Sequence, residues 1–333
     1  MEEIVVSAPG KVLIAGGYLV LDPAYSGLVI STTSKFYTII RTLKPESTAA
    51  SPAAPLPLVR VRSPQFVDAE WRYGVQIGGG ASGVDVRPLE STGGCVDPDL
   101  SSRVQLFWFF FGRGGCGRDL ITDALLPRSN KFVHLALQQT LQLVLENVAP
   151  ENVRSTLGAG LDVTIVGDND FYSQRKQLEA RALPPTTSSL AQLPRFLPTG
   201  VPIRAVHKTG MGSSAALITS LVCALLLRFG VVARAALVQG GAGASADAGA
   251  NAGDEEGRRL AHNLAQYVHC LAQGKVGSGF DVSSAIFGSH IYTRFDPSVI
   301  QGLMSDEVRG AASLSHLRAH TRPRFFILLK LGT

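Results

Sequence analysis

Hydrophobic and polar residues alternate through much of the first half of the chain, in short runs that end at turn residues. Alternation with a period of two, in segments rich in Val, Ile, Thr and aromatic residues, is typical of strands that bury one face. The first two of these runs flank a predicted turn at Pro9-Gly10, which places Lys11 at the head of the second strand. The pattern predicts strands over residues 3–10, 11–21, 27–33, 36–43, 57–63 and 161–168.

A different period, with apolar residues three and four positions apart, marks the later part of the chain. This spacing predicts helices over residues 131–148, 213–228 and 255–273. In the last of these, Leu260 and Leu264 begin one apolar stripe. Strands that come first and helices that follow predict an α+β fold.

Several segments interrupt this pattern. Pro-, Ala- and Ser-rich stretches at 43–57 and 182–200 predict surface loops. Residues 239–254 are rich in Gly and Ala and predict a low-complexity loop between two helices. Residues 93–128 follow no period and place the run LFWFFF between glycines. We interpret 93–128 as an aberrant insert, either an unusual loop or translated non-coding sequence such as a retained intron, and we predict that it lies outside the functional fold.

Composition narrows the function classes. The chain has 333 residues, of which 45% are hydrophobic and 17% charged, so we expect a folded protein of about two domains. No apolar run reaches the roughly 20 residues of a membrane span. The net charge of +5 is dispersed and lacks an aromatic-basic motif, so we expect neither a nucleic-acid nor a membrane partner. The N-terminus begins with two acids and no basic leader, and the four cysteines are scattered; both favour a cytoplasmic location with reduced thiols.

The strongest chemical motif is the run HKTGMGSSAALITSLVCALLL at 207–227. Gly210 and Gly212 permit backbone conformations that other residues avoid, and two serines then open an apolar helix. Free N–H groups at a helix start, together with the helix dipole, attract phosphate. A serine hydroxyl there can ligate Mg²⁺, and Lys208 can neutralise phosphate charge. The alternative is a glycine-rich turn followed by an ordinary serine N-cap.

Two further segments carry candidate charged groups. The run SAPGKVLIAGGYLVL at 7–21 presents Lys11, which can reach a phosphate or can be a solvated charge on an edge strand. The run QGKVGSGFDVSSAIFG at 273–288 presents Asp281 before an apolar segment. Asp281 is either a simple helix N-cap or a carboxylate held ionised by the helix N-terminus and directed at a reacting centre.

These three motifs, in this order, resemble those of the GHMP family of small-molecule kinases. The match extends over roughly residues 4–78, 130–180 and 200–300, and the segments GGYLVLD, NDFYSQR and AHNLAQYVHCLAQGKVGSGFDV look most like its phosphomevalonate kinase branch. The resemblance implies an α+β GHMP kinase fold with a ribosomal-protein-like N-terminal domain over 1–300. Residues 301–333 would begin a ferredoxin-like C-terminal domain that is largely missing, so we expect little or no activity from this chain alone.

The resemblance also implies the ligands and their contacts. The expected ligands are ATP, Mg²⁺ and 5-phosphomevalonate, and the reaction is phosphorylation of 5-phosphomevalonate to 5-diphosphomevalonate in the mevalonate pathway. The implied site residues are Lys11 and Asp281 as catalytic residues, Lys208, Gly210, Met211, Gly212, Ser213, Ser214 and Ala215 around ATP, Ser213 or Ser214 at the metal, and Lys275 and Ser278 near the substrate.

Other interpretations stay open at this point. A mevalonate kinase is disfavoured because that branch usually has an acidic residue and a His where this chain has Gly17-Tyr18. A non-catalytic or truncated, inactive member of the family is the other alternative. His262 and His269 lie near one face of the predicted 255–273 helix; packing or a phosphate contact is favoured over a metal site, and the oligomeric state is left open.

Overall fold

The computed structural model describes residues 3–43, 56–78, 83–89, 129–238 and 252–304, together with Leu314 and Leu317. The insert predicted at 93–128 lies outside the described residues. So do residues 239–251 of the predicted low-complexity loop, and nearly all of the segment predicted to begin a second domain.

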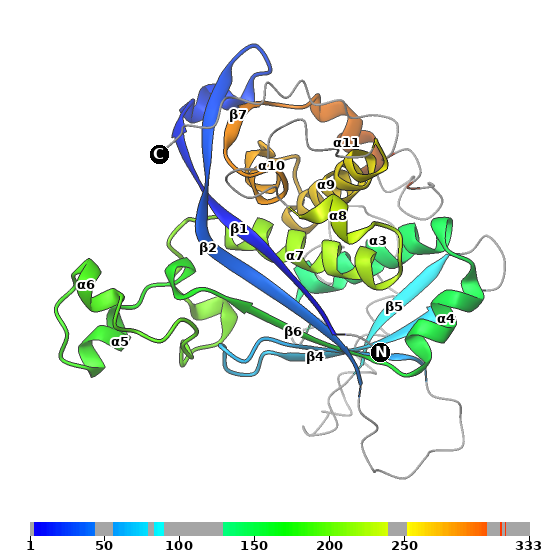
Figure 1. Ribbon diagram of the computed structural model, residues 1–333, viewed down its shortest axis with the longest axis horizontal. Coiled ribbons are helices and arrows are strands. Elements are labelled where there is room, and N and C mark those ends of the chain that lie inside the picture. The colour runs from blue at the N-terminus through cyan, green and yellow to red at the C-terminus, as the bar shows by residue number, and fades with distance from the viewer. Residues whose placement is uncertain are drawn as a thin grey trace, which may run out of the picture.

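One mixed sheet forms the framework of the described residues (Figure 1). Its strands follow the order β1-β2-β6-β3-β4-β5, and β7 pairs with the first residues of β2. Neighbouring strands are antiparallel except for β3 and β6, which run parallel. The bounds are Ile4–Ala15 for β1, Ser26–Thr42 for β2, Leu58–Arg62 for β3, Glu70–Ile77 for β4, Val84–Leu89 for β5, Leu161–Gly167 for β6 and His290–Thr293 for β7.

The larger helices gather on one face of this sheet (Figure 1). Helix α7 packs on β1 and β2, and both α3 and α9 pack against α7. Within this layer Leu221, Ile40 and Tyr73 are almost fully buried, so strands and helices share one core. The bounds are Lys131–Asn147 for α3, Pro150–Gly158 for α4, Arg175–Ala180 for α5, Thr187–Leu190 for α6, Ser213–Arg228 for α7, Arg234–Leu237 for α8, Ala252–Gln273 for α9, Phe280–Phe287 for α10 and Pro297–Met304 for α11.

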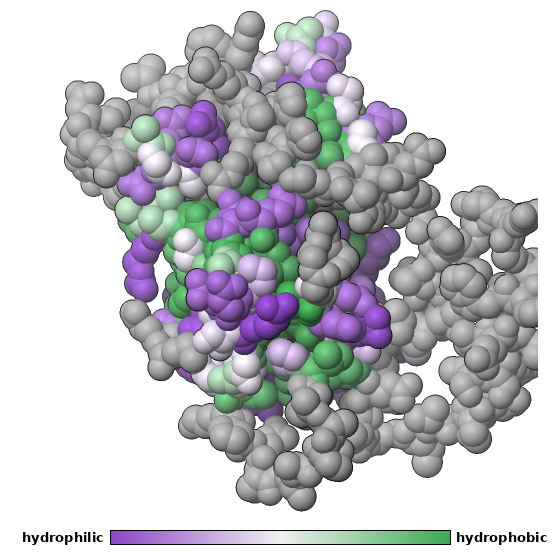
Figure 2. Space-filling model, turned by 90° about the vertical axis from the view of Figure 1, so that its right-hand side faces the viewer, coloured by the Kyte–Doolittle hydropathy of each residue, from purple (hydrophilic) through white to green (hydrophobic). Residues whose placement is uncertain are grey.

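The predicted α+β class is confirmed, and so are the three predicted helices, which correspond to α3, α7 and α9. Helix α3 begins where Asn130 caps it, because its side-chain oxygen accepts hydrogen bonds from the N–H groups of Phe132 and Val133. Among the described residues, no helix combines the length and the apolar character needed to cross a membrane. On the described part of the face in Figure 2, polar and apolar side chains are interspersed.

The prediction of a turn at Pro9-Gly10 was wrong. Strand β1 continues through both residues, and the irregularity is taken up in the pairing with β2, where Pro9 faces Lys35 but Lys11 faces Ser31. Gly10 serves a different purpose from a turn. A Cβ atom there would lie 2.8 Å from the carbonyl oxygen of Met211, so glycine lets β1 pass close to the glycine-rich loop.

Strand β1 also ends earlier than predicted. The second predicted strand was expected to reach residue 21, but the chain turns into a 3₁₀ segment, η1, over Gly17–Leu21. Gly16 precedes it with a φ of +115°, a conformation that strands exclude. The two strands expected over 27–33 and 36–43 form the single strand β2.

Candidate active site

The glycine-rich loop leads directly into helix α7. Gly210 and Gly212 have φ values of +86° and +77°, in the left-handed region that favours glycine. Gly212 is the N-cap residue of α7, and no side chain caps this end. The first backbone bond of the helix runs from the N–H of Ala216 to the carbonyl of Gly212, so the N–H groups of Ser213 and Ser214 have no partner within the helix. This arrangement suits an anion.

The 3₁₀ segment η2 (Asn169–Phe171) holds the loop from one side. The N–H of Thr209 donates to the carbonyl of Phe171 over 3.1 Å, and its hydroxyl donates to the carbonyl of Asp170 over 2.6 Å. Lys208 forms an isolated bridge with Tyr172. The segment NDFYSQR, one of those that resemble the kinases, thus lies next to the glycine-rich loop.

Lys11 joins β1 to the same loop. Its backbone N–H donates to the carbonyl of Met211 over 2.9 Å, and its ammonium group donates to the carbonyl of Gly210 over 2.9 Å. The ammonium nitrogen also lies 5.5 Å from the centroid of the Phe280 ring, at the start of α10. Burial lowers the pKa of Lys11, and the negative charge of Asp281 partly opposes this by raising it. The cation therefore has a fixed place between the starts of α7 and α10.

Helix α10 begins much as α7 does. Its N-cap, Gly279, has a φ of +85°, and no side chain caps it. A Cβ at Gly279 would lie 2.7 Å from the hydroxyl oxygen of Tyr292, so only glycine fits. Arg294 donates to the carbonyl of Gly277 over 3.0 Å and fixes the loop that precedes the helix. Asp281 lies in the first turn of the helix, where a negative charge interacts favourably with the helix dipole.

His269 on α9 connects these two helix starts. Its Nε2 atom lies 3.2 Å from the hydroxyl oxygen of Ser214 and 2.9 Å from the amide nitrogen of Gln273. Its Nδ1 atom lies 3.8 Å from a carboxylate oxygen of Asp281. Burial lowers the pKa of His269, while Asp281 acts in the opposite direction, so the imidazole is held towards its neutral form.

The structure brings most of the sequence-predicted site residues together and leaves others at the margin. Lys11, the loop from Gly210 to Ala215, and Asp281 surround one region, whereas the side chains of Lys208 and Lys275 are exposed. Ser278 contributes its backbone carbonyl, which accepts a hydrogen bond from Tyr292 over 2.5 Å. Lys11 and Asp281, the two residues predicted to be catalytic, do not form an ion pair with each other. The ammonium group of Lys11 donates instead to the carbonyl of Gly210.

Sequence reasoning missed the roles of three residues. His269 was assigned to packing or a phosphate contact, and Gln273 and Phe280 were not considered. The spacing of His269 and Gln273, four residues apart on a predicted helix, was a usable signal, because such residues are neighbours on the helix surface. Within the described residues, no group of three or more His, Cys, Asp or Glu side chains is arranged to hold a metal ion.

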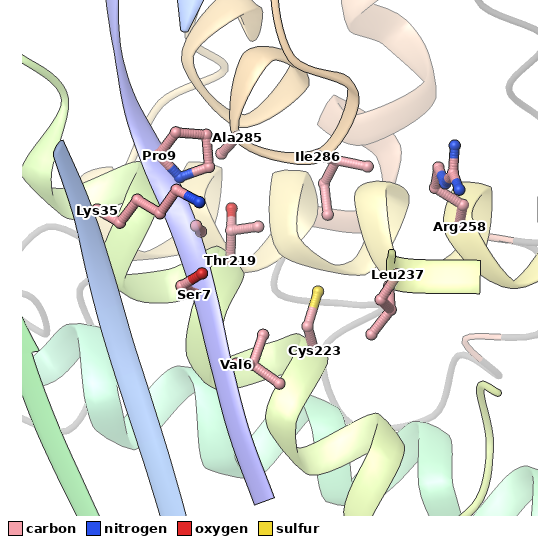
Figure 3. A pocket seen from close by; sticks show the side chains of 11 residues that line it. Val6, Ser7, Pro9, Lys35, Thr219, Cys223, Leu237, Arg258, Ala285 and Ile286 are labelled. Carbon is pink, nitrogen blue, oxygen red and sulfur yellow. The ribbon is translucent and has the colours of Figure 1, made fainter. Parts of the chain in front are cut away.

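A cavity of about 200 Å³ lies between β1 and helices α7, α8 and α10 (Figure 3). The hydroxyl of Thr219 lines it and is buried without a hydrogen-bond partner, and the buried thiol of Cys223 lies one turn further along α7. None of the residues that line this cavity belongs to the predicted site. It is therefore separate from the glycine-rich loop.

Comparison with known proteins gives relatives along nearly the whole chain, although no protein-family model matches it. The chain is 34% identical to a peroxisomal phosphomevalonate kinase of Arabidopsis thaliana, over 92% of this chain and 55% of the relative. It is 34% identical to phosphomevalonate kinase of Gibberella zeae, over 93% and 55% respectively. For phosphomevalonate kinase of Candida albicans the identity is 30%, over 94% and 54%.

Solved structures with some likeness include two kinases. A Streptococcus pneumoniae phosphomevalonate kinase in complex with phosphomevalonate and AMPPNP has a TM-score of 0.43 at 15% identity, with 96% of this chain and 57% of that one covered. A Methanococcus jannaschii mevalonate kinase has a TM-score of 0.40 at 11% identity, with 91% and 58% covered. The chain spans about half the length of the curated relatives that it matches. Over more than nine tenths of its own length, it is a relative of the plant and fungal phosphomevalonate kinases.

Proposed function

We propose that this chain binds ATP at its glycine-rich loop and takes part in transferring the γ-phosphoryl group to 5-phosphomevalonate, which gives ADP and 5-diphosphomevalonate. The observation that carries the proposal is the position of Lys11, whose ammonium group is tied to the carbonyl of Gly210 between the uncapped starts of two helices. The sequence relationship to phosphomevalonate kinases supports the choice of acceptor.

The start of α7 would receive the ATP phosphates. Its free N–H groups at Ser213, Ser214 and Ala215 offer hydrogen bonds, and the helix dipole adds a partial positive charge. Gly212 keeps the approach open, because its position has no side chain between the helix and Lys11. The loop needs no lysine after its glycines, since Lys11 supplies the cation from β1.

The start of α10 and Lys11 would receive the acceptor. A phosphate monoester has a second pKa of about 6, so it is largely ionised at pH 7 and needs little help from a general base. The difficulty is to bring two anions together, and phosphoryl transfer depends mainly on positioning and charge stabilisation. Lys11 would neutralise charge that develops between donor and acceptor. Asp281 would keep Lys11 protonated, as the direction of its effect on the Lys11 pKa indicates.

Mg²⁺ fits the chemistry of the oxygen atoms at this site. The hydroxyls of Ser213 and Ser214 and the carboxylate of Asp281 are hard donors of the kind that Mg²⁺ accepts alongside phosphate oxygens and water. When bound, the ion would neutralise the charge of the ATP phosphates. The small number of protein ligands agrees with a metal that arrives with its nucleotide.

The finer assignments belong to the same proposal. The described sheet and helices would form the ribosomal-protein-like N-terminal domain of a GHMP kinase over 1–300, with 301–333 starting a ferredoxin-like domain. Lys208 would lie near the ATP phosphates, and Lys275 and Ser278 near the substrate. We propose a cytoplasmic location, which a fluorescent fusion would test against the peroxisomal location that the name of the Arabidopsis relative states.

The test is an ADP-release assay, on a version of the protein extended to the length of its relatives, with ATP–Mg²⁺ and either 5-phosphomevalonate or mevalonate, together with calorimetric titration of ATP. We expect ATP to bind and 5-phosphomevalonate to be the better acceptor by at least a hundredfold in kcat/KM. A preference for mevalonate would overturn the assigned acceptor. Absence of ATP binding would overturn the proposed nucleotide site.

A further inference from the structure

Three consecutive carbonyl groups in the loop before α10 are held from the same side. Nη2 of Arg294 donates to the carbonyl of Gly277 over 3.0 Å and to that of Val276 over 3.4 Å. The hydroxyl of Tyr292 donates to the carbonyl of Ser278 over 2.5 Å. Tyr292 lies in β7 and Arg294 follows it directly, so all three bonds come from the strand that contacts α10 (Figure 1).

The same bonds determine where the N–H groups of this loop point. In a trans peptide the C=O of one residue and the N–H of the next point in opposite directions. Because the carbonyls of Gly277 and Ser278 point towards β7, the N–H groups that follow them point away from it. These belong to Ser278 and Gly279, and within the described residues neither has a hydrogen-bond partner. Gly279 is left-handed, and successive N–H groups beside such a residue form a concavity that binds anions.

Arg294 also joins this loop to η1. Its Nη1 donates to the carbonyl of Leu21, the last residue of η1, over 2.6 Å. Within the described residues its hydrogen-bond acceptors are all carbonyl oxygens, and no carboxylate lies within ion-pair distance of it. Its positive charge is therefore not neutralised by an acid, and it adds to the positive potential at the start of α10.

We propose that Arg294 and Tyr292 are positioning residues for the phosphate of 5-phosphomevalonate. They hold the loop carbonyls on the β7 side, so that the N–H groups of Ser278 and Gly279, together with the first N–H groups of α10, face the phosphate. The inference rests on the proposed acceptor site and adds the residues that shape it. Carbonyl oxygens repel an anion, so a loop free to turn them towards the phosphate would bind it more weakly.

The chain offers a matched control for each residue. Arg258 on α9 also donates to two backbone carbonyls, at the end of α8, over 2.7 and 3.1 Å. Tyr267 on α9 is buried to the same extent as Tyr292, and its hydroxyl donates to the carbonyl of Leu303 over 3.2 Å. Arg258→Met and Tyr267→Phe therefore remove the same kinds of bond away from the proposed site.

The substitutions at the two positions remove the bonds to different extents. Tyr292→Phe deletes one hydroxyl and keeps the ring, so the loop loses its bond at Ser278 with little change in packing. Arg294→Met removes the charge and all the bonds of the guanidinium group, whereas Arg294→Lys keeps a cation there. Thermal unfolding of each variant beside its control shows how much of any loss comes from stability alone.

The first measurement is the dissociation constant, by calorimetry, of 5-phosphomevalonate and of mevalonate, which lacks the phosphate. It uses a version of the protein extended to the length of its relatives. We expect Tyr292→Phe to weaken binding of 5-phosphomevalonate about tenfold and Arg294→Met about thirtyfold, because hydrogen bonds to a charged group are lost. Arg294→Lys should stay within about fivefold of wild type, since it keeps the charge. Binding of mevalonate and of ATP should stay nearly unchanged in every variant, controls included.

The second measurement is steady-state kinetics of the same extended protein with 5-phosphomevalonate. The KM should rise in Tyr292→Phe and Arg294→Met while kcat stays within about threefold, which is the pattern of lost ground-state binding. Equal losses of affinity for 5-phosphomevalonate and mevalonate would mean that the two residues only maintain the fold, and would overturn the inference. Unchanged binding of 5-phosphomevalonate in both variants would also overturn it. A wild-type protein that binds ATP but not 5-phosphomevalonate would instead overturn the assigned acceptor, and this inference with it.

Discussion

The ammonium nitrogen of Lys11 lies 2.9 Å from the carbonyl oxygen of Gly210, a residue 199 positions further along the chain. The backbone of the same lysine donates to Met211, so β1 and the loop are joined twice within one residue. The ammonium group of a lysine usually samples several positions. Here it is held by the carbonyl of Gly210, a residue in the left-handed backbone conformation. The positive charge at the site is therefore fixed before any ligand arrives.

Lys11→Ala should reduce kcat about 10²–10³-fold, which corresponds to roughly 3–4 kcal/mol of transition-state stabilisation for a preorganised charged group. The reason is that an already ionised acceptor needs charge neutralisation more than it needs a base. Steady-state kinetics with 5-phosphomevalonate, on a version of the protein extended to the length of its relatives, measures the effect. Glu179→Gln, a change at an exposed ion pair on α5, is the control and should stay within twofold of wild type. Near-normal turnover of Lys11→Ala, beside an inactive Asp281→Asn, would favour general-base catalysis instead.

Gly212→Val should raise the dissociation constant of ATP at least tenfold. The residue has a φ of +77°, which strains any side-chain-bearing residue, and a Cβ there would lie 3.1 Å from the side chain of Lys11. Valine would therefore strain the backbone and press against the lysine. The matched control is Gly230→Val, which has a φ of +71° but open space around its Cβ position. Calorimetric titration should show normal ATP binding in the control. Equal losses in both variants would mean that strain alone, and not the loop's place in the site, accounts for the result.

The charge of Lys11 should be lost at lower pH in Asp281→Asn than in the wild type. Burial lowers the pKa of Lys11 from 10.5, and Asp281 raises it, so removing the carboxylate leaves burial unopposed. Because the pKa is lower in the folded state, the unfolded chain binds more protons in the window just below 10.5, and the contribution of Lys11 to stability rises with pH there. A pH titration of the ¹³Cε resonance of Lys11 measures the shift. An unchanged midpoint in Asp281→Asn would show that the two charges do not interact.

The free energy of unfolding should fall as the pH drops below 6.5, in part because of His262. Burial lowers the pKa of His262 from 6.5 to about 4. Between these two pH values the histidine is therefore protonated in the unfolded state and neutral in the folded state. Stability from this residue is complete above 6.5 and is lost towards 4. Between pH 7 and pH 5 the loss amounts to about 2 kcal/mol. Urea unfolding of the wild type and of His262→Gln at both pH values should show a smaller pH effect in the variant; parallel behaviour would contradict the assignment.

Much of the framework was predictable because local sequence decides it. Helix α7 follows its predicted bounds, because Gly212, in the left-handed region, ends the preceding loop, and the residues from Ala215 to Leu227 are apolar except for Thr219 and Ser220. Strand β6 was predictable for the same kind of reason: a strict alternation of buried and partly exposed residues ends at Gly167. Such signals lie within a few residues of the element that they specify.

What the sequence could not supply were relationships between distant segments. Pro9-Gly10 is a local turn signal, and only the presence of Met211 and Phe171 next to Gly10 explains why no side chain fits there. His269 likewise has no neighbouring residues in the sequence that distinguish it from other positions of an amphipathic helix. Its contacts with Ser214 and Asp281 depend on how three helices pack, which no local pattern encodes.

The pairing of β2 with β7 has a consequence for the order in which the molecule is made. Ser26 faces Thr293 in this pair, and their hydroxyl oxygens are 2.9 Å apart across 267 residues of chain. At a synthesis rate of about 5–20 residues per second, roughly 13–53 s pass on the ribosome between the two. Through that interval the first residues of β2 have β1 on one side and an open edge on the other, and open edges invite pairing with other chains. A nascent chain stalled before residue 290 should therefore depend more on chaperones than one released after residue 293.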